Sequence, residues 1–313
     1  MLVKGGEIVA ARIDWGEGLR PGLVADARLT AKAAGTRRGV ARFADGCEAL
    51  VEALAPAACE GQTLRLRITR AAIAESGRYK LAQARPAPDR PARPAPTLFE
   101  MLRATDYPVR VVAPLDNAFS TLGWDELLEQ GQTGTVTFAG GSLSIDPTRA
   151  MTLIDVDGTL PPRALALAAV RPIVTVLDRL DIGGSVGIDF PSLADRGDRQ
   201  AVDAALAAAL GERRAERTAM NGFGFVQLVS RLERPSLVAL LARREDAAAR
   251  QLLRRAERIA EPGAIELTAS PGVRRAVRAE WQAELARRTG RRIVWRDRPA
   301  LDPTVGFAQA VVS

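Results

Sequence analysis

The chain has 313 residues, 47% of them hydrophobic, a formal net charge of +7 and no histidine. This length suggests two domains or one decorated domain, and the missing imidazole excludes Ser-His-Asp triads, histidine-ligated metalloproteases and histidine acid–base chemistry. Any hydrolysis would therefore rely on carboxylates and a metal ion.

Cysteine content and hydropathy indicate the cellular compartment of the protein. No apolar run approaches the roughly 18 to 20 residues of a membrane span, and no apolar segment typical of a signal peptide follows Lys4. Cys47 and Cys59 form no Cys-x-x-Cys pair, so we expect neither a zinc site nor a disulfide framework. These features predict a cytoplasmic protein without a membrane partner.

The positive charge is concentrated near the N-terminus. Residues 1–110 hold 18 Lys/Arg against 12 Asp/Glu, whereas residues 111–313 hold 26 against 25. A basic N-terminal region indicates a polyanionic partner. Nucleotide composition is the alternative explanation, because 41 of the 44 basic residues are arginine.

Short strands and turns dominate residues 1–85. Apolar and polar residues alternate around residues 8–13 and 23–25, with a hairpin turn expected at residues 15–18. Strands at 39–43, 49–51, 63–69 and 79–82 indicate a small OB-like β-barrel over about residues 36–84. Within residues 64–68 the arginines share one strand face, which predicts either a basic binding surface or an ordinary solvated strand.

Five prolines in residues 86–97 exclude a regular helix or central strand and predict a semi-rigid linker. The pattern then becomes α/β, and we expect a core over 98–235 and a small α/β subdomain over 236–313. The fold class is thus mixed α/β. In the core we expect strands at 109–112, 135–138 and 216–220 and helices at 124–130, 161–180 (kinked or split at Pro172), 195–210 and 223–232. In the last part we expect helices at 237–259 and 273–288 and strands at 265–267, 293–295 and 307–312.

Residues 140–158 carry the main chemical signal. They predict two short strands joined by a Pro147-Thr148 turn, with Asp155 and Asp157 on one face of the second strand. Asp189 ends a similar strand, and the intervening helix is long enough for a crossover between parallel neighbours. Adjacent carboxylates of this kind fit a magnesium site, the alternative being structural carboxylates that cap or form ion pairs.

Two families share this central motif. Residues 154–160, Ile-Asp-Val-Asp-Gly-Thr-Leu, resemble the first motif of the haloacid-dehalogenase phosphatases, and Asp198 and Asp203 mimic their last motif. That chemistry normally uses a lysine to hold the phosphoryl intermediate, yet no lysine follows Lys80, and Asp198 lies in a polar run. We therefore rank this phosphatase assignment last.

A longer, ordered resemblance is to the ribonuclease E/G family. It spans residues 140–157, then Leu-Asp-Ile-Gly-Gly at 180–184 with Ile-Asp-Phe at 188–190, then Phe-Gly-Phe-Val-Gln-Leu at 223–228 with Arg231. Residues 36–84 resemble a shortened form of that family's OB-type RNA-binding domain.

The resemblance implies a magnesium-dependent endoribonuclease acting on single-stranded RNA, with Mn²⁺ as an alternative ion. It implies that Asp155 and Asp189 bind the metal, while Asp157 stands beside them where the family usually has asparagine. Basic side chains on the barrel would then hold the RNA backbone; our candidates are Arg37, Arg38, Arg42, Arg65 and Arg67.

The chain also departs from the family pattern. The segment before the core is too short for the family's sensor of 5′-monophosphorylated ends, and the cysteine motif that links subunits through zinc is missing, so we expect no zinc-linked dimer. Gln227 and Ser230 stand where the family usually has Glu and Arg. The alternative function is therefore a catalytically inactive RNA-binding protein that retains the fold.

Overall fold

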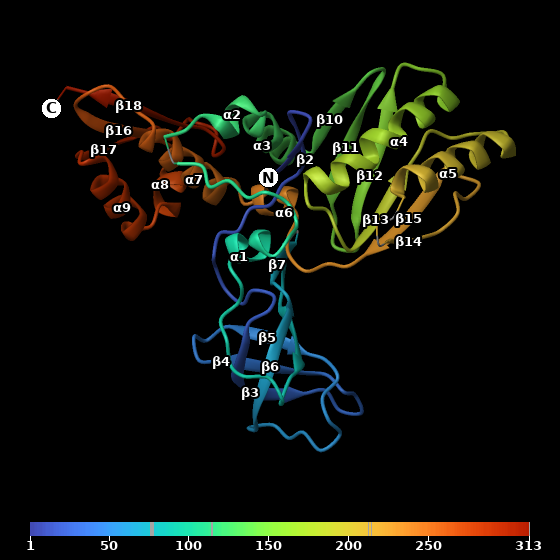
Figure 1. Cartoon of the computed structure of the whole chain (residues 1–313), viewed down its shortest axis with the longest axis horizontal. Helices are drawn as coiled ribbons and strands as arrows, with labels where there is room; N and C mark the ends of the chain where they lie inside the picture. The colour runs from blue at the N-terminus through green and yellow to red at the C-terminus, as the bar shows by residue number, and fades with distance from the viewer. Residues whose placement is uncertain (76–77, 114, 212, 214, 313) are drawn as a thin grey trace. The chain divides into compact units, whose positions relative to one another are not determined.

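The computed structural model describes residues 1–75, 78–113, 115–211, 213 and 215–312 (Figure 1). The chain divides into two compact units, the first formed by residues 1–109 and 133–239 and the second by residues 110–132 and 240–313. The fold is mixed α/β with a closed barrel near the N-terminus, which confirms the predicted fold class.

Five strands close the barrel in the order β3-β4-β5-β9-β6, with β5 and β9 parallel. This is the strand order of an OB fold. Side chains such as Leu29, Leu66 and Ile68 fill its interior. The prediction that the barrel starts near residue 36 is wrong, because β3 is its first strand. The bounds are β3 Val24–Lys32, β4 Gly39–Phe43, β5 Glu48–Val51, β6 Thr63–Arg70 and β9 Ala82–Pro86.

The N-terminal hairpin is shorter than predicted. Strands β1 (Leu2–Lys4) and β2 (Glu7–Ala10) pair across a turn at Gly5 and Gly6, both of which have positive φ. The predicted hairpin turn at residues 15–18 is wrong: β2 has already ended and pairs with β1. The alternation of polar and apolar residues extends beyond Ala10, but the hydrogen bonding between strands β1 and β2 ends there, so the alternation alone overestimated the length of the strand.

The proline-rich linker is partly attached to the barrel. Arg93 exchanges two backbone hydrogen bonds with Val24, and Ala87 N donates to Arg65 O at 2.9 Å. Thr97 then caps α1 (Leu98–Arg103) in a capping box with Glu100. A second hairpin within the first unit pairs β7 (Ile73–Glu75) with β8 (Arg78–Lys80).

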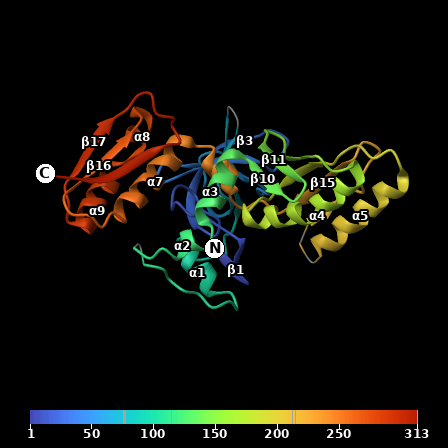
Figure 2. The same cartoon turned by 90° about the horizontal axis from the view of Figure 1, so that it is seen from above.

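A six-stranded sheet in the order β10-β11-β12-β13-β15-β14 forms the rest of the first unit. Its strands are β10 Thr135–Phe138, β11 Gly141–Pro147, β12 Thr152–Gly158, β13 Ser185–Asp189, β14 Ala215–Arg217 and β15 Phe225–Ser230. Helices α4 (Pro162–Arg179) and α5 (Arg196–Leu210) lie side by side on one face of this sheet (Figures 1 and 2). The buried side chains of Ile154, Ile188 and Val226 face these helices, which leaves the opposite face open.

Two predictions in this region are wrong. The segment predicted as a helix over 223–232 contains strand β15, whose Val226 and Leu228 are buried at the two-residue period of a strand. The strand predicted at 109–112 is also absent from that described stretch. Of the kink or split predicted at Pro172, the split does not occur, because α4 continues through this residue.

The second unit contains a three-stranded sheet, β17-β16-β18, with helices packed around its core. The two long helices predicted here each form as a pair, because Arg243 and the Val277-Arg278 junction leave helical geometry. The elements of this unit are α2 Ala118–Thr121, α3 Trp124–Thr133, α7 Arg244–Glu257, β16 Ala264–Ala269, α8 Pro271–Ala276, α9 Ala279–Thr289, β17 Ile293–Asp297 and β18 Gly306–Val311. Helix α6 (Leu237–Leu241) spans the boundary between the two units.

No helix within the described ranges is long and apolar enough to cross a membrane.

Candidate active site on the open face of the sheet

The β11–β12 hairpin positions the first two carboxylates. Thr148 closes its turn, accepting from Met151 N at 3.2 Å and donating to Met151 O at 2.7 Å through its hydroxyl. This confirms the predicted two-strand unit with its turn at Pro147 and Thr148. Along β12, Ile154 and Val156 are buried whereas Asp155 and Asp157 are exposed, as alternation requires.

The third carboxylate, Asp189, ends strand β13, which helix α4 connects to β12. Strands β12 and β13 are parallel neighbours, and Asp155 is in register with Asp189. On the other side of β12, Ser144 lies opposite Asp155 and Ser142 lies opposite Asp157. Three carboxylates and two hydroxyls thus share one face at one end of the sheet.

These carboxylates repel one another. Burial raises the pKa of Asp155 first, and the charge of Asp157, a side-chain hydrogen bond with Asp157 and the charge of Asp189 raise it further, against one backbone hydrogen bond that lowers it. That bond runs from Val156 N to Asp155 Oδ1 at 3.0 Å. Among the described residues, no arginine or lysine forms an ion pair with these three aspartates. The site therefore holds an excess of negative charge that a cation would relieve.

An apolar surface borders the carboxylates. Phe225, on β15, is in register with Asp189, on β13. The ring of Phe225 lies against Gly187. A Cβ atom at Gly187 would lie 2.5 Å from Phe225 Cζ and 2.9 Å from both Leu153 Cδ2 and Met151 Sδ. A larger residue at this position would therefore require these side chains to move, and apart from the glycine itself nothing in the sequence indicates this packing.

Gln227 is hydrogen-bonded within the sheet. Its Nε2 donates to Ser185 Oγ at 3.1 Å, across the pair β13–β15. At the position where the ribonuclease E/G family usually has glutamate, this chain thus has a neutral side chain that is hydrogen-bonded to Ser185. Ser230 ends the same strand, and its backbone N donates to Gly184 O at 2.9 Å.

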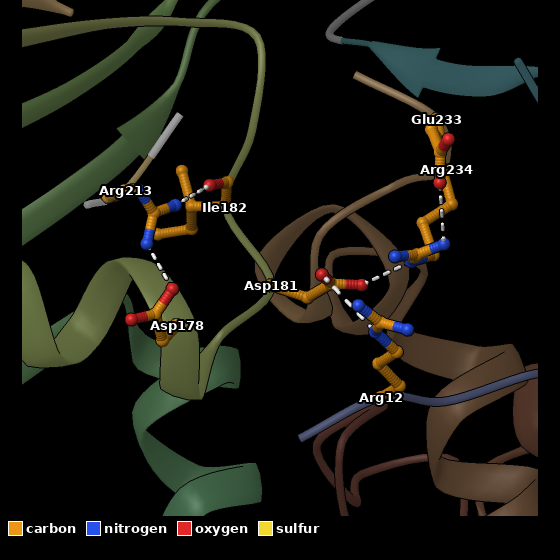
Figure 3. Close-up of polar contacts among 7 residues, drawn as sticks. All are labelled: Arg12, Asp178, Asp181, Ile182, Arg213, Glu233 and Arg234. Atoms are coloured by element: carbon orange, nitrogen blue, oxygen red, sulfur yellow. Dashed lines mark hydrogen bonds and ion pairs between the residues drawn. The ribbon is translucent and has the colours of Figure 1, made fainter. Parts of the chain in front are cut away.

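Three arginines hold the loop that leads into β13, a feature that the motifs did not predict (Figure 3). Asp181 has a φ of 51° and pairs with Arg234 Nε at 2.6 Å and Arg12 Nε at 3.7 Å. Arg213 bonds Asp178 and donates to Ile182 O at 3.0 Å. The signal in the sequence was the Asp-Ile-Gly-Gly turn, whose strained aspartate needs such support.

The barrel arginines fall into different environments. Arg65 forms a two-pronged pair with Asp26, at 2.6 and 2.9 Å, and its side chain is only 27% exposed. The half-buried Arg67 lies two residues further along β6 on the same face. The Arg65 side chain therefore joins β6 to β3, whereas no side-chain hydrogen bond of Arg67 is found among the described residues.

The other three candidates lie at or near β4. Arg42 is 60% exposed and pairs with Glu48 at 2.8 Å, and Arg38 reaches Glu52 at 3.7 Å. Arg37 donates from Nε to Leu54 O at 2.8 Å. These exposed charges lie at the surface of the barrel, on a different element from Arg65 and Arg67.

The pattern that imitated the phosphatase family does not form its site. Asp198 lies in the first turn of α5 and pairs with Arg163 at 2.9 Å, and Asp203 lies further along the same helix. Asp203 binds Arg217 at 2.6 Å and Met220 N at 2.9 Å. Both carboxylates thus hold the structure together and are not at the end of a strand.

The donor set bears on which ion would fit. In the described part of the chain, no group of three or more His, Cys, Asp or Glu side chains has an arrangement that could hold an ion. Mg²⁺ is commonly bound through one or two carboxylates, with waters and substrate phosphates completing its shell. A pair such as Asp155 and Asp189 suits that mode and not a cage made wholly of protein ligands.

The fold and this surface define an α/β protein that joins an OB-type barrel to a sheet bearing carboxylates at the end of two parallel strands. The model of the ribonuclease E/G family matches residues 99–231. The matched part contains all three aspartates and supports the ribonuclease E/G assignment that the motifs predicted. No curated protein matches the chain.

Proposed function

We propose that the protein is a magnesium-dependent endoribonuclease that hydrolyses single-stranded RNA. The observation that carries the proposal is that Asp155 and Asp189 lie in register on neighbouring parallel strands, on the open face of the sheet. Both residues fall within the segment that matches the ribonuclease E/G family model. RNA is the substrate class that this family implies.

Asp155 and Asp189 would hold the ion. Mg²⁺ supplies an activated water and offsets charge on the scissile phosphate. Asp157 shares a hydrogen bond with Asp155 and so keeps its carboxyl oriented. Ser142 and Ser144, opposite these aspartates, present hydroxyl groups that can accept or donate hydrogen bonds on the same face.

The barrel would bind the backbone of the RNA, whereas the carboxylates would act on the phosphate that is cleaved. OB folds bind single strands through a positively charged surface, and Arg38, Arg42 and Arg67 supply such charge here. Phosphate contacts of this kind are independent of sequence and weaken with salt.

The test is cleavage of an A/U-rich single-stranded RNA with and without Mg²⁺. We expect products with 5′-phosphate and 3′-hydroxyl ends, because water and not the ribose 2′-hydroxyl attacks. Cleavage that persists in EDTA, or products ending in a cyclic phosphate, would contradict the mechanism.

A second candidate function is RNA binding without catalysis. The neutral Gln227, bound to Ser185, favours it, because this position lacks the acidic group usual in the resemblance. Tight RNA binding without cleavage in Mg²⁺ or Mn²⁺ would support this alternative and exclude the endonuclease.

A further inference from the structure

An aromatic ring stands exposed beside the candidate site. Phe223 is 83% exposed, more than any other aromatic side chain among the described residues. It lies in the loop that connects β14 to β15. Its neighbours in the turn, Asn221, Gly222 and Gly224, add no apolar side chain.

The backbone around Phe223 is tightly fixed. Asn221 Oδ1 accepts hydrogen bonds from Phe223 N at 2.9 Å and Phe225 N at 3.0 Å. Backbone bonds from Gly224 N to Asn221 O at 3.2 Å and from Asn221 N to Phe225 O at 3.1 Å close the same turn. The exposed ring therefore stands on a turn that is already ordered, which lowers the entropy cost of using it in binding.

The turn is attached next to Asp189. Phe190 N donates to Gly224 O at 3.2 Å, and a Cβ atom at Gly224, which has a φ of +87°, would lie 2.8 Å from Phe190 O. Phe225 is in register with Asp189. Two residues span at most about 7 Å and registered antiparallel Cα atoms lie about 5 Å apart, so the Cα of Phe223 is within about 12 Å of that of Asp189.

We propose that Phe223 stacks on a base of single-stranded RNA and thereby positions the adjoining phosphate at Asp155 and Asp189. The inference rests on the RNA-binding part of the proposed function and extends it to a positioning residue. A single ring is enough to stack a base, whereas a stable protein interface needs a much larger buried surface than one ring provides.

The experiment measures RNA binding in EDTA, so that it does not depend on cleavage. A short labelled A/U-rich oligoribonucleotide is compared with a series in which successive positions are abasic. We expect the wild type to lose affinity at one abasic position, and Phe223→Ala to lose a similar factor, roughly 5- to 150-fold, on the intact oligonucleotide. Because base and ring act as a pair, combining the two changes should cause little further loss.

Two further variants separate stacking from bulk. Phe223→Trp should retain the affinity because it keeps an aromatic face, whereas Phe223→Leu should behave like Phe223→Ala. Phe307→Ala, at an exposed phenylalanine on β18, is the matched control and should bind like the wild type. Thermal unfolding of Phe223→Ala should be unchanged, since its ring packs on little.

Several results would overturn the inference: wild-type affinity in Phe223→Ala, an abasic effect that survives in that variant, or no RNA binding at all. A changed oligomeric state in Phe223→Ala would instead assign the ring to a contact between copies. If the abasic coupling is found but no RNA is cleaved with Mg²⁺, stacking stands and the hydrolysis proposal fails. Where cleavage does occur, Phe223→Ala should spread it over neighbouring phosphates.

Discussion

Asp155 and Asp189 lie side by side in register on the parallel strands β12 and β13, although 33 residues separate them in the chain. Parallel pairing brings the ends of both strands to the same edge of the sheet, because α4 returns the chain to its starting edge. Asp157 adds a third carboxyl two residues beyond Asp155 on the same face. The predictions below follow from this crowding and from the contacts of the barrel and of α5.

Magnesium should stabilise the folded protein through Asp155 and Asp189. A ligand that binds the native state at 100 times its Kd adds about 2.7 kcal/mol to the free energy of unfolding. We expect Mg²⁺ to raise the midpoint of thermal unfolding of the wild type, and Asp155→Asn or Asp189→Asn to remove most of this rise. Asp146→Asn, which removes an exposed carboxylate from the neighbouring strand β11, should leave it intact. An equal Mg²⁺ response in all four proteins would argue against the site.

Asp189→Asn and Asp157→Asn should differ in activity. Losing a metal ligand is expected to lower the rate of RNA cleavage more than about 100-fold, whereas Asp157→Asn should cost no more than about 10-fold. The reason is that an asparagine amide can both donate and accept a hydrogen bond, so it can replace Asp157 in its hydrogen bond with Asp155. Single-turnover cleavage measures both, and filter binding should show nearly unchanged RNA affinity. A loss in Asp157→Asn as large as in Asp189→Asn would assign Asp157 to the metal as well.

Arg67 and Arg65 should affect RNA binding differently, even though they share a strand face. If Arg67 contacts a phosphate, Arg67→Ala should reduce the slope of log affinity against log salt by about 0.7. Arg65→Ala should leave this slope nearly unchanged and lower the thermal stability of the barrel, because it breaks the pair with Asp26. The measurement is a salt titration of binding to one single-stranded RNA. An unchanged slope in Arg67→Ala would indicate a merely solvated strand.

The pair Asp203–Arg217 should make stability depend on acid pH. The hydrogen bonds from Arg217, then one from Met220 N, hold the pKa of Asp203 below its ordinary value of 3.8, against burial, which raises it. Because the folded pKa is depressed, the stabilisation is present above pH 4 or so and is lost as the pH falls through the folded value. Asp203→Ala should lower the free energy of unfolding near neutral pH by about 1.5–3 kcal/mol.

Chemical denaturation at neutral and acid pH tests this assignment, since the deficit of Asp203→Ala should shrink in acid. Asp198→Ala removes a carboxylate that pairs with the 60%-exposed Arg163 and should cost less than about 1 kcal/mol. Equal effects of the two substitutions would show that the packing of α5, and not the Asp203 pair, determines the stability.

Discrimination between RNA 5′ ends should be weak. The resemblance implies that the segment between barrel and core is too short for the family's sensor, and its described residues form only the short helices α1, α2 and α3 before β10. We therefore expect cleavage or binding of 5′-monophosphorylated and 5′-hydroxyl RNAs to differ by less than a few-fold. A strong preference for the monophosphate in a competition assay would show that another part of the chain reads the 5′ end.

The sequence alone determined the local features of the candidate site. Alternation along β12 assigned Asp155 and Asp157 to one face and Ile154 to the other, because burial on a strand has a period of two. The helix expected over 195–210 also forms, and in the structure Asp195 caps it by accepting hydrogen bonds from Gly197 N and Asp198 N. These signals depend on residues a few positions apart, so they can be read without knowing the fold.

Long-range pairing decided the rest. Residues 225–230 form a strand because β13 supplies a partner for their hydrogen bonds, and a local pattern did not distinguish this from a helix. Arg65 looked free for RNA until the barrel brought Asp26, 39 residues away, against it. Asp181 likewise meets Arg234, 53 residues further on. Such contacts depend on which strands and loops become neighbours, which is fixed by the burial of the whole core and not by any one segment.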